Sequence, residues 1–128
     1  MSPDVQSWLG QIPWGPVALV SLVVVFFVVS SANSKKKRAV LAQKIAEGAK
    51  VIDVRSQGEF GSGHFAGAIN IPVDTLGSRL KSLGALDAPV VVYCASGGRA
   101  SQAAGMLKAA GYTDVTNAGG LGSMPRDL

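Results

Sequence analysis

The longest hydrophobic stretch of the chain lies near its start and predicts one membrane-spanning helix. No residue from Val5 to Ser34 is charged, and the residues from Ile12 to Ala32 are almost wholly apolar. As a helix, that stretch is about 31 Å long at ~1.5 Å per residue, which matches the ~30 Å hydrocarbon core of a bilayer. Trp8 and Trp14 lie at its front edge, where amphipathic rings favour the headgroup layer.

Charge around this stretch predicts its orientation. Only Asp4 precedes it, whereas four cations, Lys35 to Arg38, follow directly. By the positive-inside rule the C-terminal part lies in the cytoplasm, as a single-pass protein of the inner membrane. The predicted organisation is an extracytoplasmic segment (1–11), a transmembrane helix (12–33), a basic juxtamembrane segment (34–38) and a folded domain (39–128).

A cleaved secretory signal is the alternative, and it would place the domain in the periplasm. The small residues Ser30, Ser31 and Ala32 suit a cleavage site. Against cleavage, no basic region precedes the apolar stretch, the stretch is long, and the cations beyond the site oppose export. We therefore expect an uncleaved anchor.

The remaining residues alternate between helical and strand patterns, which predicts a parallel sheet flanked by helices, the α/β class. Apolar spacing, glycines and Pro72 mark the boundaries. The predicted order is helix 38–47, strand 51–54, a Gly-rich loop 58–67, strand 68–71, helix 73–83, strand 88–93, helix 100–110, strand 115–117 and a closing loop 119–126.

The single cysteine, Cys94, occurs between the buried strand 88–93 and the helix that begins near residue 100. The four small residues that follow it (Ala95, Ser96, Gly97 and Gly98) allow successive backbone amides to turn toward the sulfur. Arg99 adds a permanent cation. Such a cradle favours a thiolate and accommodates an anion beside it, which predicts a nucleophilic site.

Cysteine is also a common inert core residue, and only the loop around Cys94 reverses that expectation. One cysteine excludes an internal disulfide. His64 is the only histidine, so we expect no metal site and no cofactor. His64 falls in the Gly-rich loop, which disfavours a Cys–His dyad.

The net charge of +4 comes mostly from Lys35 to Arg38, because residues 39–128 hold eight Lys or Arg and seven Asp or Glu. The basic cluster suits anionic lipid headgroups. No aromatic residues are interleaved with these cations, so we expect no nucleic-acid partner. The oligomeric state is open.

Three ordered motifs resemble the rhodanese (sulfurtransferase) family. Residues 51–72 resemble its N-terminal signature, the Tyr93–Cys94 loop its active-site loop, and residues 112–121 its closing motif. The likeness covers residues 39–128, and it is greatest to small single-domain members of the phage-shock type. It implies the rhodanese fold, a small sulfur donor such as thiosulfate, and a thiol or cyanide acceptor.

The resemblance implies that Cys94 carries the transferred sulfur as a persulfide and that the amides of residues 95–99 stabilise it. Arg99 either contacts the donor or braces the loop. The residues expected to support the loops structurally are Asp53, Arg55, Glu59 and His64.

Two function classes follow. The first is a membrane-anchored sulfurtransferase, favoured by the intact cysteine loop. The second is a non-enzymatic membrane-tethered module that binds a partner or senses persulfide.

Related phosphatases and arsenate reductases place five residues between the cysteine and the arginine. Four residues separate Cys94 from Arg99, which suits a single sulfur atom and disfavours phosphatase activity.

Overall fold

The computed structural model describes residues 14–126, which divide into two compact units between Lys35 and Lys36. The expected extracytoplasmic segment, Trp8 and the first residues of the expected span lie outside the described residues, as do residues 127–128. Helix α2 (Trp14–Ala46) contributes residues to both units. The expected short helix from Arg38 to Glu47 is therefore the last part of α2.

The first unit is the N-terminal part of α2. Its large apolar side chains from Val17 to Val29 are exposed to the surroundings. The helix is long and apolar enough to cross a membrane by length and composition. The predicted apolar helix near the N-terminus is therefore present.

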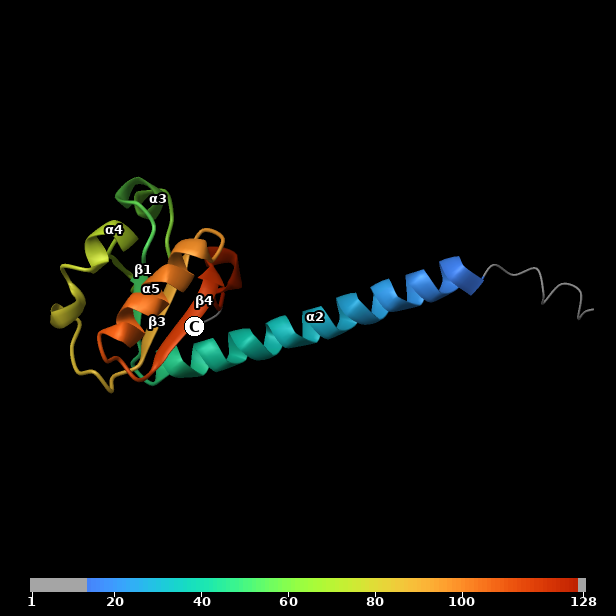
Figure 1. Cartoon of the computed structure of the whole chain (residues 1–128), viewed down its shortest axis with the longest axis horizontal. Helices are drawn as coiled ribbons and strands as arrows, with labels where there is room; N and C mark the ends of the chain where they lie inside the picture. The colour runs from blue at the N-terminus through green and yellow to red at the C-terminus, as the bar shows by residue number, and fades with distance from the viewer. Residues whose placement is uncertain (1–13, 127–128) are drawn as a thin grey trace, which may run out of the picture. The chain divides into compact units, whose positions relative to one another are not determined.

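The second unit contains a four-stranded, all-parallel sheet, which confirms the predicted fold class (Figure 1). The spatial order is β2-β1-β3-β4. Strand β3 is buried along its whole length, because it lies between two other strands and is covered on both faces. The strands are β1 (Lys50–Asp53), β2 (Ile69–Asn70), β3 (Val90–Cys94) and β4 (Val115–Gly120).

Alternate residues of the central strands enter two separate cores, as the period of a strand requires. On one face, Ile52, Val92 and Cys94 pack against the small residues of α5 (Gly98–Ala109). On the other face, Val91 and Tyr93 pack with Leu41, Val51, Ala118 and Met124. Leu41 belongs to α2, so the last part of that helix covers the second face of the sheet.

The structure differs from the predicted elements in the helix 73–83, in the loop 58–67 and in the last strand with the loop after it. The predicted helix 73–83 is divided into α4 (Val73–Leu76) and a 3₁₀ turn, η1 (Leu80–Ser82). Gly77 follows α4, and the hydroxyls of Thr75 and Ser78 donate to carbonyls three residues earlier, so local bonds compete with a continuous helix.

The predicted Gly-rich loop 58–67 contains a short helix, α3 (Gln57–Gly61), which begins with a capping box between Ser56 and Glu59. The last strand is longer than predicted and extends to Gly120. It is followed by the 3₁₀ turn η2 (Leu121–Ser123), where a loop was expected.

Candidate active site

Cys94 is the last residue of β3, and its sulfur is enclosed by the loop that leads into α5. Only 1% of the residue is exposed. The backbone N–H of Gly97 donates to Sγ across 2.8 Å. Gly97 has a φ of 106°, a left-handed conformation that glycine adopts far more readily than other residues. The tight turn at Gly97 therefore directs the loop amides toward the sulfur.

These amides favour the ionised form of the thiol. Burial raises the pKa of Cys94, because it penalises the charged sulfur. Hydrogen bonds from backbone amides lower the pKa by more, so that it lies below its ordinary value of 9.0. The donors are the amides of Ala100, Gly97, Ser96 and Arg99. The site is therefore an anion cradle built from the start of a helix.

The end of β4 forms the back of this cradle. Tyr93 pairs with Gly119 and Cys94 with Gly120, after a one-residue shift in the pairing of β3 with β4. A Cβ atom on Gly120 would lie 2.4 Å from the carbonyl oxygen of Ala95, closer than any side chain allows. Sequence reasoning missed this contact, and the glycine pair at residues 119–120 is the signal that could have indicated it.

Arg99 forms a two-pronged ion pair with Glu59. Its two terminal nitrogens donate to the Glu59 carboxylate over 2.7 and 3.0 Å. Hydrogen bonding to Arg99 and to Ser56 lowers the pKa of Glu59 to about 2. The pair joins α3 to the end of the cysteine loop, and both side chains are a little over one-third exposed. The guanidinium is thus engaged by the protein itself.

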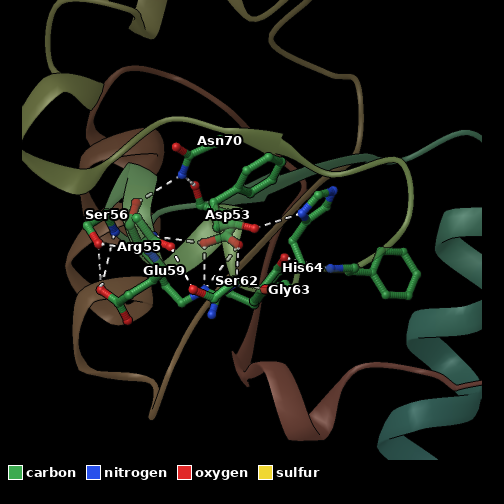
Figure 2. Close-up of polar contacts among 12 residues, drawn as sticks. Asp53, Arg55, Ser56, Glu59, Ser62, Gly63, His64 and Asn70 are labelled. Atoms are coloured by element: carbon green, nitrogen blue, oxygen red, sulfur yellow. Dashed lines mark hydrogen bonds and ion pairs between the residues drawn. The ribbon is translucent and has the colours of Figure 1, made fainter.

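Asp53 and Arg55 form a buried pair at the end of β1 (Figure 2). Burial raises the pKa of Asp53, but hydrogen bonds from the side chain and backbone of Arg55 outweigh it and hold the pKa below its ordinary value. Arg55 also donates to the carbonyl oxygen of Gly63 over 2.6 Å. Asn70 donates to the carbonyls of both Asp53 and Arg55. This network ties the loop after α3 to the sheet.

His64 lies in the same loop, where its ring stacks on Phe60 with a centroid separation of 3.6 Å. Nδ1 lies 2.9 Å from the carbonyl oxygen of Phe60. Its hydrogen bonds within residues 14–126 do not include Cys94. Over the same described residues, no three His, Cys, Asp or Glu side chains cluster as metal ligands would.

Comparison with known proteins establishes the family. The model of the rhodanese-like domain matches residues 37–121, about two-thirds of the chain. The chain belongs to the rhodanese family. The thiosulfate sulfurtransferase PspE of Escherichia coli is 41% identical over 71 residues, which cover 55% of this chain and 68% of PspE.

Two further relatives are named as uncharacterised proteins. The protein YqhL of Bacillus subtilis is 41% identical over 69 residues, and the match covers 54% of each chain. The chain thus spans about half the length of that relative. The Escherichia coli protein YibN is 30% identical over 124 residues, covering 88% of this chain and 84% of YibN.

The fold of a solved rhodanese agrees with the sheet described above. An Escherichia coli rhodanese determined with anions superimposes with a TM-score of 0.57 at 39% identity. The match covers 60% of this chain and 94% of that structure. The predicted family and fold are confirmed, and homologues of this rhodanese domain include thiosulfate sulfurtransferases.

The ion pair between Glu59 and Arg99 predicts a pH dependence of stability. Because the pKa of Glu59 is lowered from 4.5 to about 2 on folding, the pair stabilises the rhodanese domain fully above pH 4.5. That contribution is lost as the pH falls toward 2. Glu59→Gln should therefore unfold at a lower temperature than the wild type at pH 6, and the two melting temperatures should converge in acid. A difference that is constant from pH 6 to pH 3 would contradict this role of the pair.

Proposed function

We propose that the protein is a sulfurtransferase in which Cys94 carries sulfane sulfur between a small donor and a thiol acceptor. The observation that carries this proposal is the Gly97 amide 2.8 Å from Sγ, with three further amides directed at the same atom. A thiolate is the reactive form of cysteine, and these donors favour it. Homologues named as thiosulfate sulfurtransferases support the same activity.

The reaction follows in two displacements. The Cys94 thiolate attacks the outer sulfur of thiosulfate, the S–S bond of the donor breaks, and sulfite leaves with the bonding electron pair. The loop amides then hold the anionic persulfide, as an oxyanion hole holds developing charge. An acceptor thiolate attacks the outer sulfur, the bond to Sγ breaks, and the Cys94 thiolate is restored. With cyanide as the acceptor the product is thiocyanate.

The arginine at the end of the loop serves this reaction by bracing the cradle. Both terminal nitrogens of Arg99 are bonded to Glu59, which leaves the backbone amides as the donors directed at the sulfur. The length of the loop supports sulfur transfer over phosphate chemistry. Four residues separate Cys94 from Arg99, one fewer than the spacing expected of a phosphate site, and this short loop favours a single sulfur atom as the transferred group.

The persulfide is the direct test of the proposed chemistry. Thiosulfate should add one sulfur atom, about 32 Da, to the protein at Cys94, and cyanide or excess thiol should remove it. Intact-mass analysis before and after each addition measures both steps. The Cys94→Ser variant is the control and should show no adduct. Thiosulfate turnover by that variant would refute the mechanism.

We further propose that helix α2 anchors the rhodanese domain to the inner membrane, with the domain in the cytoplasm. The exposed apolar side chains of α2 up to Val29 support a span, and the basic residues from Lys35 support the orientation. The match with YibN covers 88% of the chain, more than the second unit alone, so it extends into the apolar helix. Reduced cytoplasmic thiols would keep Cys94 free and could accept its sulfur.

The anchor and its orientation can be tested together. The full chain should remain with membranes after carbonate extraction, because a helix of this apolar length is stably inserted. A reporter that requires the cytoplasm, fused after Leu128, should be active, and one that requires the periplasm should be inactive. A shortened, soluble protein beginning near Asn33 would instead show that the apolar segment is a cleaved signal.

A further inference from the structure

Arg38 differs from the three lysines that precede it in the basic segment. Lys35, Lys36 and Lys37 are exposed, whereas Arg38 is half-buried. Its Nη2 donates to the carbonyl oxygen of Gly122 across 2.9 Å. The two residues are 84 positions apart in the sequence, so this bond joins α2 to the turn η2 after β4. Arg38 is therefore bonded within the rhodanese domain through one guanidinium nitrogen, in an exposed hydrogen bond.

The segment that Arg38 holds is the one that supports the cysteine loop. Gly120 lies so close to Ala95 that a Cβ atom on the glycine would collide with the Ala95 carbonyl oxygen. Gly119 lies behind Gly97, because a Cβ atom on Gly97 would be 3.5 Å from the Cα of Gly119. Gly97 is the donor at 2.8 Å from Sγ. A displacement of the 119–122 segment would consequently loosen the amide cradle.

We propose that Arg38 is a positioning residue for the Cys94 loop, acting through Gly122 and the end of β4. One bond from α2 fixes the turn η2, the turn fixes the glycine pair 119–120, and that pair sets the position of Ala95 to Gly97. The part of α2 that belongs to the second unit thereby supports the cysteine cradle. The assignment takes Cys94 as the nucleophile of the proposed sulfur transfer, but the contacts on which it depends do not require that reaction.

Other charges near the sulfur must be separated from this effect. Arg99 interacts favourably with ionised Cys94 from the start of α5. Asp53 and Arg55 lie at the end of β1 and neutralise each other. From α2, the ammonium of Lys37 lies 3.9 Å from the place where a Cβ of Gly119 would be. Removing a cation from this helix could alter the pKa of Cys94 through charge alone, so the control must remove the same charge without touching the loop.

The test compares Arg38→Gln with Lys36→Gln in the full chain, purified in detergent. Both variants lose one positive charge from the same part of α2, and Lys36 is exposed. The readout is the rate of Cys94 alkylation by iodoacetamide as a function of pH, whose midpoint reports the pKa of the thiol. Alkylation does not require sulfur transfer, so this result stands even if thiosulfate is not a substrate. Thermal unfolding of each variant is recorded in parallel.

We expect Arg38→Gln to raise the midpoint by roughly half a unit to one unit, which is about a three- to tenfold weaker ionisation of the thiol. Lys36→Gln should leave the midpoint unchanged. The midpoint of Arg38→Lys should lie between those of the wild type and Arg38→Gln, because an ammonium can still donate to the Gly122 carbonyl. If Arg38→Gln does not fold, Arg38→Met is used instead. Methionine also removes the donor, but it is a good helix former and its aliphatic side chain can pack as the stem of arginine does.

Two results would overturn the proposal. Equal shifts in the Arg38 and Lys36 variants would mean that charge alone matters. A lower melting temperature in the Arg38 variant with an unchanged alkylation midpoint would mean that the bond to Gly122 stabilises the fold without positioning the loop.

Discussion

The proposed chemistry of the rhodanese domain depends on one requirement: backbone amides at the start of a helix must stabilise an anionic sulfur. Sγ of Cys94 is buried, and burial by itself would suppress ionisation. The amides must therefore approach closely and from several directions, as the 2.8 Å contact with Gly97 does. This requires a short loop of small residues whose backbone is supported from behind. The glycine pair at the end of β4 provides that support, because no side chain could fit against Ala95.

Charged pairs around the cradle hold the surrounding loops without entering it. Asp53 and Arg55 are buried, hydrogen-bonded to each other and joined to the loop at Gly63. Breaking such a pair leaves an uncompensated buried charge, which is strongly destabilising. Glu59 and Arg99 form a more exposed link between α3 and the cysteine loop. The cysteine loop is thus in contact with β4 and is joined to α3, and we propose that the bond of Arg38 to η2 adds to this support.

The parts of this arrangement that follow local sequence patterns could be predicted. The apolar run before Cys94 predicted a buried strand, the small residues after it predicted a tight loop, and the alternation of elements predicted a parallel sheet. The short helix α3 was missed, although the Ser56 and Glu59 spacing of a capping box is present in the sequence. The predicted helix from Val73 was too long, because the local hydroxyl bonds near Gly77 were not anticipated.

Contacts between distant residues could not be predicted from one sequence. Arg99 and Glu59 are 40 positions apart, and Arg38 and Gly122 are 84 apart. Local patterns show that each residue is charged or small, but they do not show which partner the fold brings to it. Lys35 to Arg38 were all interpreted as a juxtamembrane cluster for this reason. The fold separates Arg38 from the three lysines by giving it a backbone partner.

The pH at which the Cys94 thiol ionises is the most direct test of stabilisation by the loop amides. The far-ultraviolet absorbance of the thiolate can be followed across a pH titration of the wild type, with the Cys94→Ser protein subtracted at each pH. The subtraction removes the tyrosines, including Tyr93, whose pKa is raised by burial to about 12. We predict a single transition with a midpoint below the ordinary value of 9.0, because the loop amides stabilise the ionised sulfur. A midpoint at or above 9.0 would show that burial outweighs the amides and would contradict the cradle as the source of reactivity.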